Sequence, residues 1–299
     1  MEKEELIKEQ LEKVKRMLFK ANFLTNEVMS GEYSSAFRGQ GLEFNEVREY
    51  VPGDDVRLID WNVTARTGTP YIKSFNEERE ISVMIVVDAS SSMFFGSGGD
   101  GRLERASALA AFIGYNAIKN HDKVGLLIFS DTVEKYIPHK KGKSHLWHII
   151  NELIRFEPTG KSSNLNIALE YLLKVVRKKT IVFMISDFYL KDFEQSMRIA
   201  SKRHDLIAIR LKEEFEEAMP DAGILELKDF ETGKTVVVDA GNKKTAEVIA
   251  ANLAKQKSDL TGLFNRLKID LMELGTADDV SQKFLQLFKK REKKFLKFH

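Results

Sequence analysis

The stretch Ile81–Met93, ISVMIVVDASSSM, constrains the fold more than any other part of the chain. Its first part, Ile81–Val87, is almost entirely apolar and rich in β-branched side chains. A run this short indicates a strand buried on both faces rather than a helix. The strand is followed at once by Asp88 and by hydroxyls that include Ser90 and Ser92. Because α/β folds place their ligand sites at the carboxyl ends of parallel strands, we expect a site at this edge.

A second apolar strand, Thr180–Ser186, also ends at an aspartate, Asp187. The hydrophobic periodicity predicts helices at 102–120, 144–156, 164–176 and 190–201, and further strands at 124–130, 132–137 and 204–211. This alternation predicts an α/β domain with a doubly wound, mostly parallel sheet and helices on both faces. In such a sheet the two strands lie side by side where the chain reverses, so Asp88 and Asp187 should lie close together at the carboxyl edge of the sheet.

The remaining segments give weaker signals. Residues 3–20 are expected to form an amphipathic helix, whose apolar face carries Ile7, Leu11, Val14 and Leu18. A loop rich in Gly and Ser is expected at 30–41, a hairpin at 223–227 and 235–238, and helices at 242–271 and 276–298. The last helix is rich in Lys and Arg. We interpret it as a solvated face, with contact to a partner or to acidic lipid as the alternative.

Residues 42–80 combine turn signals with aromatic and charged side chains. The tetrapeptides Pro52–Asp55 and Thr67–Pro70 mark turns, and charged residues surround Trp61. One interpretation is a small β-rich appendage whose ion pairs hold it against the main sheet; the other is a docking surface. We therefore expect three regions: an N-terminal helix and β-rich segment at 1–80, the sheet domain at 81–240, and C-terminal helices packed on the core at 241–299.

The oxygen-bearing residues at the sheet edge suit a hard divalent cation. Asp88, Ser90 and Ser92 supply a carboxylate and two hydroxyls close together in the sequence. Asp187 adds a second carboxylate, and either Ser162 or Ser163 adds a third hydroxyl; Mg²⁺ prefers such oxygen ligands. In the structural alternative, Asp88 caps the helix at 102–120 and Asp187 caps the helix that follows it.

These residues resemble a known site. The patterns Asp88-x-Ser90-x-Ser92, Ser163-Asn-Leu and Ser-Asp187-Phe resemble the metal-ion-dependent adhesion site of von Willebrand factor A domains. Upstream, three short runs are similar to a bacterial branch of such proteins: Arg48–Asp55, Ile59–Trp61 and Ala65–Arg66. This branch is an uncharacterised-domain family, typically encoded beside MoxR-type AAA+ ATPases and BatA-like aerotolerance proteins. The resemblance covers about residues 30–275.

The resemblance implies a von Willebrand factor A-like (Rossmann-like) fold and a role for each site residue. Ser90, Ser92 and Ser163 would contact the ion directly, whereas Asp88 and Asp187 would act directly or through water. One coordination position would stay open for an acidic side chain of a partner, either a MoxR-type ATPase or a BatA-like protein. The second metal loop of such domains usually carries threonine, and Ser163 stands in that position here.

The resemblance and the residues together predict a non-enzymatic, metal-dependent protein-interaction module. We expect Mg²⁺ as the ion, with Mn²⁺ or Ca²⁺ as alternatives. The competing hypothesis is a metal-dependent hydrolase, in which Asp88 and Asp187 would hold a cation that activates water.

Composition narrows the function class further. Lys and Arg nearly balance Asp and Glu, for a net charge of +2, so no global charge points to nucleic acid. Cysteine is absent, which excludes disulfides, thiolate zinc sites and a cysteine nucleophile. No segment reaches the roughly 18–20 apolar residues of a membrane span, and the charged start of the chain lacks a signal-peptide core. We expect a cytoplasmic protein, with peripheral attachment at the inner membrane left open.

Overall fold

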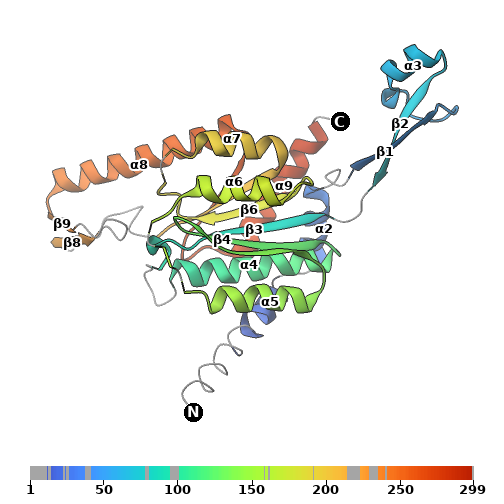
Figure 1. Ribbon diagram of the computed structural model, residues 1–299. Helices are drawn as coiled ribbons and strands as arrows, with labels where there is room; N and C mark the ends of the chain where they lie inside the picture. Colours follow the sequence, from blue (N-terminus) through green and yellow to red (C-terminus); the bar gives the residue numbers. More distant parts are fainter. Residues whose placement is uncertain are drawn as a thin grey trace.

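The fold is built on a central six-stranded sheet with helices on both of its faces (Figure 1). The computed structural model describes residues 12, 15–22, 24, 27–37, 42–77, 81–94, 101–157, 159–160, 162–190, 192–213, 223–228, 235–239 and 241–297. The sheet has the strand order β10-β7-β6-β3-β4-β5. Its strands are β3 (Ser82–Asp88), β4 (Lys123–Phe129), β5 (Val133–Lys140), β6 (Ile181–Ser186), β7 (Asp205–Leu211) and β10 (Asp270–Leu274). Neighbouring strands are parallel except β4 and β5, which are antiparallel.

Strand β3 lies inside the sheet, between β4 and β6, and its residues alternate between two hydrophobic layers. Val83, Ile85 and Val87 pack on one face, and Met84 and Val86 pack on the other. This two-sided burial explains why the strand is apolar at nearly every position instead of at every second one.

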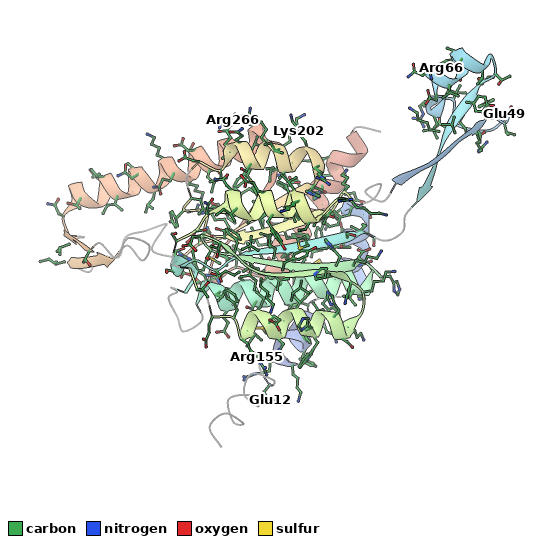
Figure 2. All side chains as sticks on the ribbon, viewed as in Figure 1. Glu12, Glu49, Arg66, Arg155, Lys202 and Arg266 are labelled. Atoms are coloured by element: carbon green, nitrogen blue, oxygen red, sulfur yellow. The ribbon has the colours of Figure 1, made fainter. Side chains whose placement is uncertain are left out.

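Helices cover each face of the sheet (Figure 1). One layer contains α2 (Glu27–Ala36), α4 (Arg102–Lys119), α5 (Lys143–Ile154) and α9 (Val280–Lys297). The other contains α6 (Leu165–Val175), α7 (Glu194–Arg203) and α8 (Lys243–Arg266). Side chains fill the space between these helices and the sheet (Figure 2). The predicted fold class, a doubly wound and mostly parallel sheet with helices on both faces, is confirmed.

Two segments differ from the sequence-based expectation. The helix predicted at 242–271 is wrong at its end, because α8 stops at Arg266 and β10 joins the sheet beside β7. Lys268 has a φ of +57°, which breaks the helix between them. Residues 30–36 belong to helix α2 instead of the expected loop, and its buried Tyr33 donates a hydrogen bond to Asp122 Oδ2 (2.9 Å).

The C-terminal helix α9 is part of the core as well as a basic surface. Phe284 and Phe288 are buried and in contact with each other; Phe288 packs against Phe37, and Phe284 packs on the sheet residue Phe183. On the same helix Arg291 forms ion pairs with Asp205 and Asp270. The interpretation as a solvated face therefore holds only for the outer side of α9.

An appendage of residues 42–77 projects away from the sheet (Figure 1). Two antiparallel strands, β1 (Leu42–Glu49) and β2 (Tyr71–Glu77), carry a tip formed by η1 (Val56–Leu58) and α3 (Trp61–Thr67). Glu49 and Arg66 mark the tip in Figure 2, well separated from the main body. The appendage is β-rich as predicted, but helix α3 was not anticipated.

Ion pairs inside the appendage fix the shape of its tip. Arg48 makes a two-fold contact with Asp54, at 2.7 and 2.9 Å, and Asp60 caps helix α3 by accepting from two backbone N–H groups. Lys73 on β2 pairs with Asp60 at 3.4 Å. These pairs join appendage residues to one another, in contrast to the expectation that they would hold it against the main sheet.

The remaining described segments add little to the core. Strands β8 (Ile224–Lys228) and β9 (Thr235–Asp239) form the predicted hairpin. Residues 15–22 are helical and Leu18 packs on the core, whereas Ile7, Leu11 and Val14 lie outside the described residues. Among the helices that the structure describes, none has the length and apolar character needed to cross a membrane.

Candidate functional site

The site lies where the chain reverses direction across the sheet. From β3 the chain runs to β4 and β5 on one side, and it then returns through β6 to β7 and β10 on the other. Asp88 is the last residue of β3, and Asp187 directly follows β6, the strand beside it. The two carboxylates therefore occupy the same edge, as expected for a topological switch point.

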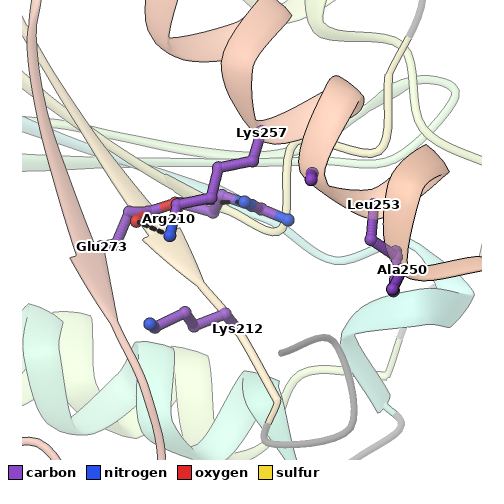
Figure 3. A pocket seen from close by; sticks show the side chains of 7 residues that line it. Arg210, Lys212, Ala250, Leu253, Lys257 and Glu273 are labelled. Carbon is purple, nitrogen blue, oxygen red and sulfur yellow. Dashed lines mark hydrogen bonds and ion pairs between the residues drawn. The ribbon is translucent and has the colours of Figure 1, made fainter. Parts of the chain in front are cut away.

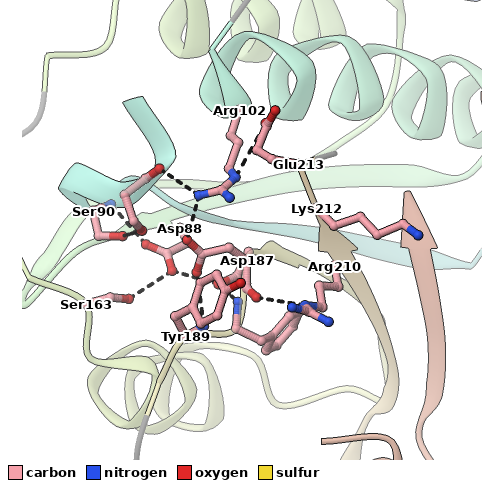
Figure 4. Close-up of polar contacts among 12 residues, drawn as sticks. Asp88, Ser90, Arg102, Ser163, Asp187, Tyr189, Arg210, Lys212 and Glu213 are labelled. Carbon is pink, nitrogen blue, oxygen red and sulfur yellow. Dashed lines mark hydrogen bonds and ion pairs between the residues drawn. The ribbon is translucent and has the colours of Figure 1, made fainter. Parts of the chain in front are cut away.

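Asp88 is completely buried and accepts hydrogen bonds from three residues (Figure 4). The backbone N–H of Ser90 donates to Oδ1 at 2.9 Å. The hydroxyls of Ser163 and Ser186 donate to Oδ2 at 2.9 and 2.8 Å. Ser163 is thus the serine of its loop that reaches Asp88, which distinguishes it from Ser162.

The two serines of the first loop lie beside this carboxylate. A short 3₁₀ turn, η2 (Ser91–Phe94), follows β3, and the hydroxyl oxygens of Ser90 and Ser92 are 3.2 Å apart. Asp187 completes the group and accepts from the backbone N–H of Tyr189 at 3.1 Å. The structure brings the predicted residues to one edge; their binding of a metal stays a prediction.

Burial first, and then the nearby negative charge of Asp187, raise the pKa of the Asp88 carboxyl from 3.8 to about 6, against the smaller lowering effect of its hydrogen bonds. Two like charges held in a buried position repel one another, and a cation between them would relieve that cost.

The oxygen atoms gathered at this edge are of the chemical type that a hard cation binds. They are carboxylate and hydroxyl oxygens, which Mg²⁺ prefers. Within the described part of the chain, no group of three or more His, Asp or Glu side chains could hold a metal. An ion at this edge would therefore depend on Ser90, Ser92, Ser163 and water to complete its shell.

Neither aspartate serves as the helix cap that the structural alternative requires. The N-cap of α4 is Gly101, and that of α7 is Phe193; neither makes a side-chain capping bond. Asp88 and Asp187 instead direct their oxygens into the site (Figure 4).

Two residues at the site were missed by sequence reasoning. Arg102, at the start of α4, lies 3.2 Å from Asp187 Oδ2 through Nη1. Ser186 bonds Asp88, and its position directly before Asp187 was the available signal. For Arg102 no local signal existed, because 14 residues separate it from Asp88 and the contact depends on the tertiary fold.

A clamp around Glu134 holds the loop that presents Ser163. Glu134 Oε1 accepts from Ser130 Oγ (2.6 Å), Thr159 N (3.2 Å) and Gly160 N (2.9 Å), and Oε2 accepts from Thr159 Oγ1 (2.6 Å). A Cβ at Gly160 would come within 2.2 Å of Ser130 Oγ, so only glycine fits this close approach. The clamp therefore ties the segment just before Ser163 to the start of β5.

A pocket of about 270 Å³ lies between α8 and the ends of β7 and β10 (Figure 3). Glu273 pairs with both Arg210 and Lys257, at 3.1 and 3.4 Å (Figure 3). Arg210 also donates through Nε to the backbone oxygen of Asp187 at 3.2 Å, so the pocket and the Asp88 site share a wall.

Comparison with known proteins gives a family match. A family model described as "Protein of unknown function DUF58" matches residues 46–259. The "Uncharacterized protein Rv1480" of Mycobacterium tuberculosis (strain ATCC 25618 / H37Rv) is 31% identical over 209 residues, covering 69% of this chain and 66% of the relative. The "Uncharacterized protein YeaD" of Bacillus subtilis (strain 168) is 30% identical over 108 residues, covering 36% and 25%. The matches thus span less than two thirds of these relatives' own length.

Solved structures with a similar chain path include "conserved hypothetical protein BatB" from Bacteroides thetaiotaomicron, with a TM-score of 0.44 and 15% identity, covering 71% of this chain and 99% of that one. A "von Willebrand factor type A" from Catenulispora acidiphila has a TM-score of 0.38 and 9% identity, covering 74% and 44%. Because TM-scores this low support no further conclusion, the fold assignment rests on the chain's own topology.

Proposed function

This chain belongs to the DUF58 family of proteins of unknown function, and we propose that it is a non-enzymatic protein-interaction module with a metal-dependent docking site. The observation that carries the proposal is the convergence of Asp88, Asp187 and three serine hydroxyls at the switch point of the sheet. The hydrolase alternative receives no support from the matched relatives, which are described only as uncharacterised.

In this proposal Ser90, Ser92 and Ser163 contact a divalent ion, Mg²⁺ first and Mn²⁺ or Ca²⁺ as alternatives. Asp88 and Asp187 balance its charge directly or through water. The bound ion supplies a positive centre for one acidic side chain of a partner. The chain's own residues do the rest: they hold the oxygens at one edge and exclude bulk water from Asp88.

The partner we propose is a MoxR-type AAA+ ATPase, with a BatA-like protein as the alternative. The proposal for both rests on the sequence resemblance. The site's buried negative charge is consistent with it, because an unliganded pair of carboxylates would repel an acidic partner until a cation is bound.

Affinity capture of the purified MoxR-type ATPase from the same genome tests this function. We expect capture in Mg²⁺ and its loss in EDTA or on Asp88→Asn, because each removes the ion that the partner carboxylate needs. The control is Asp259→Asn, a change at an exposed carboxyl on α8, which should capture normally. Capture that is indifferent to both EDTA and Asp88→Asn would refute the proposal.

The tip of the appendage supplies a second candidate contact for that partner. Trp61 is 70% exposed, and Val51, Val56 and Leu58 are exposed in the same tip. An exposed tryptophan beside other exposed apolar side chains is typical of binding surfaces.

We expect Trp61→Ala to weaken binding of the ATPase about tenfold or more. The same change should alter the free energy of unfolding by less than about 0.5 kcal/mol, because the indole makes few packing contacts at the exposed tip. Trp147→Ala on α5, the other tryptophan of the chain and also partly exposed, is the matched control. Equal binding by both variants would remove the tip from the interface.

A further inference from the structure

A buried arginine already supplies positive charge at the proposed metal site (Figure 4). The side chain of Arg102 is only 4% exposed, and its Nη1 lies 3.2 Å from Asp187 Oδ2. The same nitrogen donates to the backbone oxygen of Ser92 at 3.1 Å. Arg102 therefore contacts two of the residues that would surround the ion.

The guanidinium also faces a second carboxylate, on the side away from Asp187. Arg102 Nε lies 3.6 Å from Glu213 Oε1, and the side chain of Glu213 is completely buried. Arg105, one turn further along α4, contacts the same Glu213 oxygen through Nη1 at 3.1 Å. Arg102 thus lies between Asp187 and Glu213 and can strengthen its contact with either one.

Charge balance makes the contact with Asp187 sensitive to a bound ion. Asp88 and Asp187 together carry −2 when ionised, and Arg102 reduces this to −1. A divalent ion added beside Arg102 would bring the group to +1 in a buried place, where like charges repel strongly. The balance favours Arg102 turning from Asp187 to Glu213 when an ion enters.

We infer that Arg102 competes with the divalent ion for Asp187, and that Glu213 receives the guanidinium when the ion binds. This inference rests on the proposed metal site. Its consequence is that Arg102 offsets one of the two carboxylate charges when no metal is bound, and that the metal affinity is set by the Arg102–Asp187 contact.

Isothermal titration of Mg²⁺ and of Mn²⁺ into the full chain, freed of metal with a chelator, tests the inference. We expect Arg102→Gln to tighten the dissociation constant about tenfold or more and to lower the melting temperature of the metal-free chain. Arg105→Gln removes an equal charge that contacts Glu213 but not Asp187. It should change the dissociation constant by less than about threefold.

A second variant, with the opposite expected effect on metal affinity, distinguishes the inference from a general disruption of the ion pairs around Arg102. Glu213→Gln removes the acceptor to which Arg102 would turn, so it should weaken metal binding, whereas Arg102→Gln strengthens it. Disruption of packing alone would move both variants in the same direction. If Arg102→Gln fails to fold, Glu213→Gln and Arg102→Lys, which keeps a weaker charge contact, carry the test.

Each result decides a different point. Tighter binding by Arg102→Gln supports the inference, even if the unaltered chain binds no ion; in that case the metal dependence proposed above fails while the competition stands. If the unaltered chain binds the ion and Arg102→Gln leaves that binding unchanged or weakens it, the inference is overturned, while the proposed metal site stands. If neither protein binds Mg²⁺ or Mn²⁺, both the metal site and the competition are refuted.

Discussion

Replacing Asp88 by asparagine should make the metal-free protein more stable at pH 7.5, by about 1–3 kcal/mol, and should abolish any stabilisation by Mg²⁺. Asp88 is fully buried beside Asp187, and this environment raises its pKa to about 6. A tenfold change in proton affinity corresponds to about 1.4 kcal/mol, which sets the size of the gain. Asparagine can still accept from Ser90 N and can donate to the hydroxyls of Ser163 and Ser186, so the geometry should persist.

The size of this stability gain depends on pH. Because the folded-state pKa of Asp88 lies above its ordinary value of 3.8, the folded chain binds the proton more tightly than the unfolded chain. The stability from this group is therefore present below about pH 4 and lost as the pH rises through about 6. The advantage of Asp88→Asn should be near zero at pH 4 and complete above pH 7.

Chemical denaturation at several pH values, with EDTA and with Mg²⁺, measures both effects. Asp259→Asn on the surface of α8 should show neither. A metal-free Asp88→Asn variant that is markedly less stable at pH 7.5 would mean that the carboxylate is held by favourable contacts that outweigh its burial. Retained stabilisation by Mg²⁺ in this variant would place the ion elsewhere.

Replacing Phe288 by alanine should cost about 3–5 kcal/mol of unfolding free energy, the range for a fully buried aromatic ring. The ring of Phe288 lies 5.7 Å from the rings of Tyr33, Phe37 and Phe284, so its loss leaves a cavity where α2 and α9 meet. Urea denaturation followed by circular dichroism measures the change.

Phe19→Ala is the matched control, since Phe19 is exposed in the helical segment 15–22 and should change stability by less than about 0.5 kcal/mol. A loss below about 1 kcal/mol on Phe288→Ala would contradict the placement of α9 in the core. The same packing means that deletion of residues 276–299 would remove core side chains, so it cannot isolate a role of the basic surface.

The sequence was most informative where burial is two-sided. The runs ending at Asp88 and Asp187 are apolar at nearly every position, which is how interior parallel strands differ from helices. Strand β10 was missed because it is short and lies at an edge, where only Asp270, Met272 and Leu274 are buried and the alternation is easily mistaken for helical spacing. Helix α3 was missed because its stability comes from the Asp60 cap and not from an apolar face.

The same division holds for the site. Asp88 and Asp187 were predictable because each follows a recognisable strand and topology places adjacent strand ends together. The residue types alone left Ser162 and Ser163 open, and the resemblance to the adhesion site indicated Ser163. The position of Arg102 was not predictable, because it depends on how a helix terminus lies in three dimensions. In the structure the Ser163 hydroxyl donates to Asp88, and Arg102 contacts Asp187.

The appendage leaves the sheet from the opposite side to Asp88. Strand β2 leads into the beginning of β3, whereas Asp88 is at its end, so one strand length of about 20 Å separates Asp88 from the start of β3. The tip with Trp61 lies farther still, at the far end of β1 and β2 (Figure 1). A single protein that binds both the Asp88 site and the tip must extend along the body of the domain, whereas two smaller proteins could bind the two surfaces at the same time. Double replacement of Trp61 and Asp88 distinguishes these cases. If the two surfaces bind separate proteins, the losses of binding free energy add; if one protein binds both, the loss saturates after the first replacement.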